Sequence, residues 1–295
     1  MNGKLKQQLK RLIRISFRVS PSLSAQVWNV VCLYIFRDER RAYRGKLKQP
    51  QGDRKSIVFF SHNRCASMML NKRIQELMEG CGYRNIDYQR LVHGWPEKER
   101  EAFRWDAEVH SASGRFLPKM FYYGVFRYYV DILGLENMHP ILVLRDPRDV
   151  ITSRYFSEAF AHVALDKVFH EHTERVRKMD VDTFVKTFAK DVEEHYSHFR
   201  ENYSKMEQGV IWKYEDLIDD FEGFLVDVNE KCNLGKSGKF VAEIASKESF
   251  KVSSEDKFSH KRSVKAGSYL EKLKPETIDY LNELFAETLV FFGWE

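Results

Sequence analysis

The chain alternates short, continuous apolar runs with longer segments whose apolar residues recur at helical spacing. Three runs, at 56–60, 141–144 and 210–212, predict strands that are buried on both faces, as in a parallel sheet. A short strand that ends at Leu117-Pro118 is also predicted. Helices are predicted from Ser67 to the glycines at 80 and 82, and over 121–133, 156–206 with a break near Asp180, 221–231, 240–246 and 275–292. This alternation of strands and helices indicates an α/β fold.

The stretch from 139 to 155, HPILVLRDPRDVITSRY, contains the clearest switch from strand to helix. Its apolar run stops at Arg145, and Asp146-Pro147 then provides a helix cap and a proline at the first helical position. Ser153 follows Asp146 by seven residues, about two helical turns, and so lies over the same face as the cap. Arg145 and Ser153 would thus point into one crevice at the carboxyl edge of the sheet, which suits a phosphate. In the simpler alternative, Arg145 only pairs with Asp146 or Asp149.

A second candidate for anion binding lies where the main domain begins. The strand 56–60, the polar loop 61–66 and the helix from Ser67 have the layout of a phosphate loop. Arg64 and Ser67 would add side-chain donors to the N–H groups of the loop. Neither GxxxxGK[ST] nor GxGxxG occurs anywhere in the chain, so this loop is not a Walker A motif. Many α/β proteins begin in the same way, so the loop is informative only together with Arg145.

Composition and charge narrow the class of protein. Apolar residues make up 43% and charged residues 31%, as in a globular protein, and no apolar run is long enough to span a bilayer. The four cysteines are scattered without a CxxC pair, which argues against a zinc ribbon and fits a reducing, cytoplasmic compartment. Residues 1–55 carry fourteen Lys and Arg against three Asp and Glu, whereas the remaining 240 carry 34 against 40. The excess of positive charge is therefore confined to the N-terminus, which argues against a general nucleic-acid-binding surface.

The basic N-terminus predicts a helical extension over residues 1–55, followed by the main domain over 56–295. Residues 4–19 place leucines on one helical face and basic residues on the other, a pattern typical of helices that lie on anionic membranes. We therefore expect a cytoplasmic protein with peripheral contact to a membrane. In the alternative, these helices pack on the main domain and their basic face is solvated.

Taken together, four short segments resemble the sulfotransferase family, which uses 3′-phosphoadenosine 5′-phosphosulfate (PAPS). The segments are NRCASMML at 63–70, RDPRDVITS at 145–153, WKYEDL at 212–217 and KRSVKAGSYLEKL at 261–273. The resemblance implies a three-layer P-loop NTPase-like fold, with a central parallel sheet flanked by helices. It also implies that the 5′-phosphosulfate is held by Arg64 and by the loop residues Cys65, Ala66, Ser67, Met68 and Met69. The 3′-phosphate would contact Arg145 and Ser153, with Arg262 as a second ligand beside Ser263, and Tyr214 would contact the adenine.

The chain departs from the family pattern at several of these positions. Ala66 stands where the family usually has a glycine, Met68 replaces a hydroxyl residue, and Met69 replaces an aromatic residue. In the late loop, Ser263 and Val264 replace a lysine and a glycine. Each departure weakens the expected contacts with PAPS, but the three arginines at 64, 145 and 262 are retained.

Transfer of a neutral SO₃ unit needs positioning and cationic donors, so no metal is expected. The acceptor must lose a proton, and a general base is therefore expected. The cytosolic branch of the family has a histidine before a Leu-Pro pair, where this chain has Phe116. The remaining candidates are Asp87, His93 and His110, of which we favour the two histidines because imidazole titrates near neutral pH.

These observations predict an enzyme, a sulfotransferase that acts on a hydroxyl or an amine of a glycan, a glycolipid or a small metabolite. Two alternatives stay open. The replaced positions and the unassigned base would also fit a catalytically silent nucleotide-binding adaptor, and the phosphate-loop layout would fit an atypical small-molecule kinase. The oligomeric state and the acceptor cannot be read from the sequence.

Overall fold

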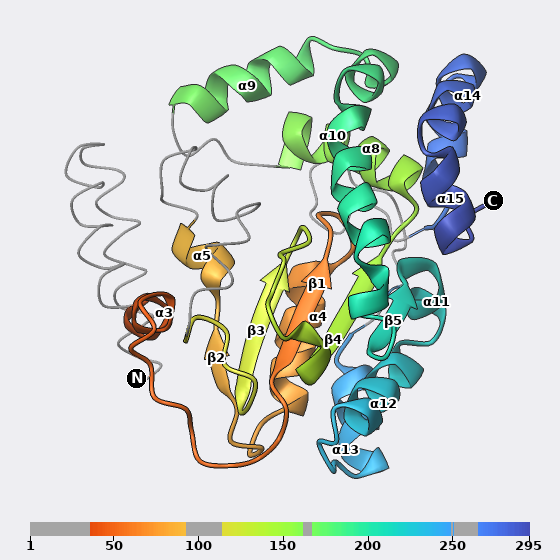
Figure 1. Ribbon diagram of the computed structural model, residues 1–295. Helices are drawn as coiled ribbons and strands as arrows, with labels where there is room; N and C mark the ends of the chain where they lie inside the picture. The colour runs from red at the N-terminus through yellow and green to blue at the C-terminus, as the bar shows by residue number, and fades with distance from the viewer. Residues whose placement is uncertain (1–35, 93–113, 162–166, 249, 251–264) are drawn as a thin grey trace.

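The computed structural model describes residues 36–92, 114–161, 167–248, 250 and 265–295. Its centre is a five-stranded, all-parallel sheet with the strand order β2-β3-β1-β4-β5 (Figure 1). The strands span Ile57–Ser61 (β1), Arg84–Ile86 (β2), Phe121–Phe126 (β3), His139–Leu144 (β4) and Val210–Lys213 (β5). This is the parallel α/β sheet that the apolar runs predict.

Helices cover both faces of the sheet and connect its strands. The α-helices are α3 (Arg37–Tyr43), α4 (Ser67–Leu77), α5 (Tyr88–Val92), α8 (Pro147–Phe156), α9 (Lys167–Arg177), α10 (Val181–Glu201), α11 (Tyr214–Asp219), α12 (Phe221–Lys231), α13 (Gly238–Ser246), α14 (Pro275–Leu284) and α15 (Ala286–Phe292). Short 3-10 or π turns lie at Leu135–Asn137, Ser157–Ala161, Tyr203–Lys205 and Ser268–Glu271.

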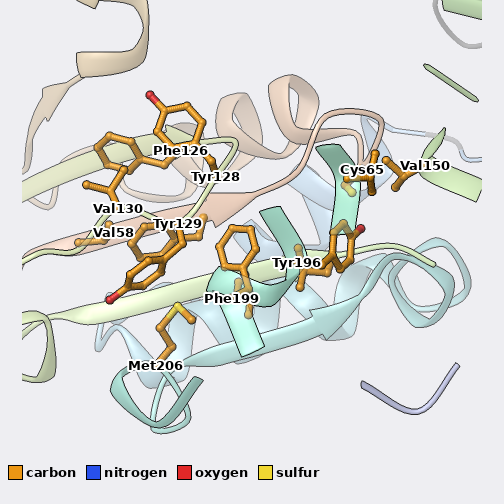
Figure 2. Packing of buried hydrophobic residues seen from close by; sticks show 14 of the residues in the cluster. Val58, Cys65, Phe126, Tyr128, Tyr129, Val130, Val150, Tyr196, Phe199 and Met206 are labelled. Carbon is orange, nitrogen blue, oxygen red and sulfur yellow. The ribbon is translucent and has the colours of Figure 1, made fainter. Parts of the chain in front are cut away.

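The buried side chains of β1 alternate between two hydrophobic clusters. Val58 and Phe60 pack with residues of α8, α10, α14 and α15, whereas Ile57 and Phe59 pack with residues of α4, α12 and α13. Figure 2 shows part of the first cluster, in which Tyr196 and Phe199 of α10 lie over the sheet. The sheet is therefore the middle layer of three, and its polar edges are the places left for ligands.

The strand order reverses at β1, which fixes the position of the crevice. From β1 the chain passes to β2 and β3 on one side, and then to β4 and β5 on the other. In open α/β sheets such a switch point, at the carboxyl ends of the strands, is where ligands bind. The loop after β1 and the turn after β4 meet at this point, because Ser61 pairs with Val143.

Most predicted elements are confirmed. The strands at β1, β4 and β5, the helix start at Ser67, the helix over Phe221–Lys231 and the break before Val181 all occur, and Asp180 caps the helix that follows the break. The predicted terminal helix is divided at Phe285 into α14 and α15, with Pro275 at its first position. The helix predicted before residue 36 lies outside the described residues.

The prediction of a helix over 121–133 is wrong. Residues 121–126 form β3, a central strand between β2 and β1 whose side chains are all buried. Aromatic and branched residues favour strands, and a buried strand lacks the polar alternation that would distinguish it from a buried helix. The strand predicted to end at Leu117-Pro118 is also wrong. Residues 114–118 form no strand, and the strand of this region, β3, begins only at Phe121.

No helix among residues 36–92, 114–161, 167–248 and 265–295 is both long enough and apolar enough to cross a membrane. Residues of the predicted extension also reach the core, since Phe36, Ala42 and Leu47 belong to the first hydrophobic cluster. The boundary between an extension and a main domain at residue 55 stays a prediction.

Candidate functional site

The residues that follow the five strands form one polar row along the carboxyl edge of the sheet. In strand order they are Asp87, Arg127, His62, Arg145 and Tyr214, after β2, β3, β1, β4 and β5 respectively. Neighbouring parallel strands lie about 4.8 Å apart, so successive members of the row are close enough to act on one ligand.

The loop after β1 presents its backbone to this crevice. Arg64 and Ala66 have positive φ angles of 72° and 54°, and Ala66 forms the left-handed N-cap of α4. Glycine adopts this left-handed conformation without a steric cost, whereas alanine does not. The backbone at Ala66 is therefore strained, at the position where the sulfotransferase pattern has glycine. Among the described residues, the N–H groups of Cys65, Ala66, Ser67 and Met68 have no hydrogen-bond acceptor. Such a run of free N–H groups at a helix start favours an anion.

Side chains of the loop residues divide between the core and the solvent. Cys65 is fully buried, its thiol donates to the carbonyl of Asn63 at 3.8 Å, and burial raises its pKa to about 12. Ser67 is also buried, Met69 packs on the second hydrophobic cluster, and Met68 is 51% exposed. Cys65 therefore offers only its backbone to a ligand, and Met68 faces the solvent.

Arg64 extends from the loop toward α8. Its Nε donates to the hydroxyl of Ser153 at 3.3 Å, and its guanidinium donates to the hydroxyl of Ser157 at 2.9 Å. Burial and the positive charges of Arg145 and Arg127 lower the pKa of Arg64. The side chain has no carboxylate partner among the described residues, so an anion would relieve this repulsion.

Arg145 is 3% exposed and is the most constrained cation of the site. It donates to Asp149 Oδ2 at 3.0 Å and to the carbonyl of Lys265 at 3.0 Å, and its guanidinium lies 4.7 Å from the ring centre of Tyr214. Its Nε is buried and has no hydrogen-bond partner. The simple pairing with Asp149 thus occurs, but it leaves one donor for a ligand.

The carboxylate of Asp149 joins α8 to the segment after residue 264. It is fully buried and accepts hydrogen bonds from the N–H of Gly267, the hydroxyl of Ser268 and the N–H of Tyr269, at 2.8, 3.0 and 3.0 Å. Together with the contact to Arg145, this carboxylate receives four donors. The pair of Arg145 and Asp149 therefore holds the late segment beside the strand end.

Asp146 and Arg148 form a second buried pair with a structural role. Asp146 accepts from the backbone N–H of Arg148 at 2.8 Å, as the predicted helix cap, and its carboxylate lies 2.7 Å from the guanidinium. Arg148 also donates to the carbonyl of Trp294 at 2.6 Å. These groups fix the start of α8, and with it the position of Ser153.

The loop after β1 also contacts α10 through two histidines. His62 Nε2 and His195 Nδ1 are 3.1 Å apart, and the ring of His62 packs on Tyr196. Although His195 lies on a helix rich in charged residues, it is half-buried against the loop.

The structure brings together Arg64, Arg145, Ser153 and Tyr214, which lie far apart in the sequence. His93, His110, Arg262 and Ser263 lie outside the described residues. The sequence did not single out Ser157 and Arg127, and it suggested only a helix-dipole or ion-pair role for Asp149. The spacing of Ser157, one turn after Ser153, was the available signal for it.

No group of three or more potential metal ligands occurs in the described part of the chain. The donors at the carboxyl edge instead fit a nucleotide with two phosphate-like ends. Arg145 Nε lies on the β4 side, and the loop N–H groups with Arg64 follow β1. This donor set suits the anionic groups of PAPS, so the residues present fit this co-substrate.

Comparisons with known proteins agree with this geometry. A family profile described as a sulfotransferase domain matches residues 133–292, and no curated protein sequence matches. A mouse sulfotransferase complexed with PAP has a similar fold, with a TM-score of 0.53 and 14% identity over 79% of this chain and 84% of that chain. Retinol dehydratase with retinol and PAP gives 0.50 and 15%, over 86% and 85%. Its complex with androsterone and the inactive cofactor PAP gives 0.51 and 14%, over 86% and 84%.

At such identities the solved structures establish the fold alone. The family profile reaches further, because it covers more than half of the 295 residues and includes β4, α8 and the segment that Asp149 holds. The loop after β1 lies before the matched region, so its assignment depends on the geometry described above. This chain belongs to the sulfotransferase family and is a PAPS-dependent sulfotransferase.

Proposed function

We propose that this enzyme transfers the sulfuryl group of PAPS to a hydroxyl group of a glycan, a lipid or a small metabolite. One observation carries the proposal. Within the described residues, four consecutive N–H groups after β1 and the Nε of Arg145 after β4 have no acceptor, and the strands that precede them are adjacent. Buried donors without partners are costly, so their clustering at a switch point supports a ligand with several anionic groups.

The proposed roles follow the positions of these donors. Arg64 and the N–H groups of residues 65–69 would bind the 5′-phosphosulfate. Arg145 and Ser153 would bind the 3′-phosphate, because Arg145 retains its Nε for this purpose while Asp149 orients the rest of the guanidinium. Tyr214, which stacks on Arg145, would contact the adenine. Arg262 and Ser263 stay proposed ligands outside the described residues.

Chemistry at the acceptor requires a base. The acceptor oxygen forms a bond to sulfur, the bond between sulfur and the bridging oxygen breaks, and the acceptor loses one proton. Positive charge near the bridging oxygen stabilises the leaving phosphate, a task suited to Arg64. Of the three candidate bases only Asp87 is in the described part of the chain, and it follows β2 on the side of β1 away from Arg145.

The role of Asp87 can be separated from donor binding. Asp87→Asn should lower kcat by about 10²–10⁴ if this carboxylate takes the proton. Its affinity for adenosine 3′,5′-bisphosphate (PAP) should stay unchanged, since Asp87 follows β2, on the side of β1 away from Arg145. An unchanged kcat would transfer the role to His93 or His110, each of which is tested by substitution with glutamine.

The class of acceptor is tested by a donor-dependent assay. Radiolabelled PAPS is incubated with the protein and with lipid, glycan and soluble small-molecule fractions of cells. The solved retinol dehydratase complexes contain retinol and androsterone, which supports a small hydroxyl compound as the first acceptor to test. Label in no fraction, although PAP binds, would favour a silent nucleotide-binding protein.

We further propose that the enzyme is cytoplasmic and contacts anionic membranes through its basic N-terminus. Each Lys or Arg near such a surface contributes about 1 kcal/mol, so several together would hold the enzyme there. The full-length protein should sediment with vesicles that contain phosphatidylserine at low salt, and a variant that lacks residues 1–20 should not. Equal sedimentation of both proteins would contradict this proposal.

A further inference from the structure

Arg127 is a half-buried cation that the roles proposed above do not use. It directly follows β3 at the carboxyl edge of the sheet. Its Nε is buried and has no hydrogen-bond partner, and among the described residues the side chain forms neither an ion pair nor a hydrogen bond. Burial lowers its pKa, and the charge of Asp87 opposes that shift only in part.

The arginines of the described chain that are buried, rather than half-buried like Arg127, each have a carboxylate partner. Arg73 lies 2.7 Å from Glu76 and 2.6 Å from Glu248, Arg145 lies 3.0 Å from Asp149, and Arg148 lies 2.7 Å from Asp146. A guanidinium carries five donors and remains charged, so removing it from water without a partner is costly. An unpaired arginine at a ligand-binding edge therefore points to an anionic group that the protein does not itself supply.

The register of the sheet places Arg127 on the β3 side of β1. Phe126 pairs with Phe60, so Arg127 lies beside Ser61, immediately before the loop that Arg64 belongs to. Arg145 lies on the other side of β1, after β4. Both arginines lower the pKa of Arg64 through their charge, as expected for cations that flank it.

We propose that Arg127 binds an anionic group on the acceptor, so that the enzyme prefers acceptors carrying a carboxylate, sulfate or phosphate near the reacting hydroxyl. This inference rests on the proposed function. The anionic groups of the donor already have Arg64, Arg145 and the loop N–H groups, all on β1 or on its β4 side. Arg127 adds a fork of donors on the β3 side, and such a fork matches a carboxylate or a sulfate in two parallel hydrogen bonds.

The acceptor end of the site would thus contain a cation and a carboxylate from neighbouring strands. Arg127 would fix the anionic group of the acceptor, and Asp87, one strand further out, would lie toward the reacting hydroxyl. Loss of one charge-assisted contact should weaken binding of the acidic acceptor roughly ten- to hundredfold. Binding of a neutral acceptor of the same shape should change little.

The test uses two matched pairs of probes that differ in a single charge. They are 4-hydroxyphenylacetate with 4-hydroxyphenylacetamide, and methyl β-glucuronide with methyl β-glucoside. Binding is measured by calorimetry on the full-length protein saturated with PAP, for wild type, Arg127→Gln and Arg127→Lys. Arg84→Gln is the control, because this arginine begins β2 at the opposite edge of the sheet and pairs with Asp38.

We expect wild type and Arg84→Gln to bind at least one acidic probe ten times more tightly than its neutral partner. Arg127→Gln should abolish this preference and Arg127→Lys should retain part of it, while PAP affinity stays within twofold in all variants. The inference is overturned if wild type shows no preference, if Arg127→Gln retains it, or if Arg127→Gln weakens PAP itself. Failure of the proposed function is distinct, since wild type would then transfer no label from PAPS to any fraction, whichever probes it binds.

Discussion

Positive charge is organised differently on the two sides of the loop after β1. On the β4 side, Arg145 and Arg148 are each paired with a buried carboxylate, and Asp149 also receives three donors from residues 267–269. The cations of the loop and of the β3 side lack such partners: among the described residues, the side chain of Arg64 in the loop contacts only two hydroxyls, and Arg127 after β3 has no polar partner. The paired charges hold the scaffold in place, whereas the unpaired charges are available for ligands.

The largest effect is expected when the buried carboxylate that pairs with Arg145 is removed. Asp149→Ala would deprive four donors of their shared acceptor and Arg145 of its counter-charge. We expect the free energy of unfolding to fall by about 3–5 kcal/mol, measured by urea denaturation. As a control, Glu287→Ala removes an exposed partner of Arg200 and should cost less than about 1 kcal/mol. Similar losses in the two variants would contradict the structural role of Asp149.

At Arg64, which has no carboxylate partner among the described residues, we expect a large loss of activity with little loss of stability. Arg64→Gln removes a charge that burial and Arg145 disfavour, so the free energy of unfolding should stay constant or rise. At saturating PAPS, kcat should fall by about 10²–10³, as for loss of one preorganised donor to a developing oxyanion. Turnover is followed by release of labelled sulfate ester. A stability loss comparable to that of Asp149→Ala would show that Arg64 belongs to the scaffold.

A charge-preserving change at Arg145 separates its structural contact from its proposed contact with the ligand. Arg145→Lys keeps a positive charge for Asp149 but removes the buried Nε. Affinity for PAP should fall by about tenfold or more, whereas affinity for 5′-AMP, which lacks the 3′-phosphate, should change little. Calorimetric titration of both nucleotides gives the two ratios. Equal losses of affinity for PAP and 5′-AMP would contradict the proposal that Arg145 binds the 3′-phosphate.

The smallest expected effect concerns the thiol of Cys65, which is fully buried in the loop after β1. Burial raises the pKa of Cys65 to about 12, and an unfolded thiol titrates near about 8.5. Stability from this thiol is therefore complete below about pH 8.5 and is lost as the pH rises toward 12, because the unfolded chain ionises first.

At pH 9.5 the thiol of Cys65 should account for a loss of about 1 kcal/mol relative to pH 8. Urea denaturation at the two pH values should show a loss that is smaller by this amount in Cys65→Ser than in wild type. Cys232→Ser is the matched control on the other side of the sheet. Burial also raises the pKa of Cys232 to about 12, so this variant should show the same reduction in pH dependence. An unchanged pH dependence in Cys65→Ser would mean that this thiol is accessible in the folded protein.

How much of the site the sequence predicts depends on the distance over which each residue acts. Asp146, Pro147 and the strand before Arg145 are local signals, and they place the start of α8 correctly. The loop at Arg64 and Ser67 is likewise set by the strand and helix beside it. Local patterns therefore suffice where one turn of the chain decides the geometry.

Long-range features could not be predicted in the same way. Arg127 was missed because residues 121–133 were assigned to a helix, which hides the fact that Arg127 ends a strand. Asp149 also accepts hydrogen bonds from residues 267–269, which lie 118 to 120 residues away along the chain. No local pattern connects these residues with Asp149. Phe116, at the position compared with the family's catalytic histidine, lies before β3, whereas Arg127 follows the same strand at the carboxyl edge of the sheet.

The four hydrogen bonds that Asp149 accepts also bear on the order in which the protein folds. Strands β1 to β4 pair among themselves within residues 57–144, whereas the nucleotide site needs residues 267–269 to return to α8. The entropy cost of closing so long a loop grows only slowly with length, but contacts of this separation form late. PAP would then find no complete site during early folding. We expect it to slow unfolding of the finished protein while leaving the rate of sheet formation unchanged.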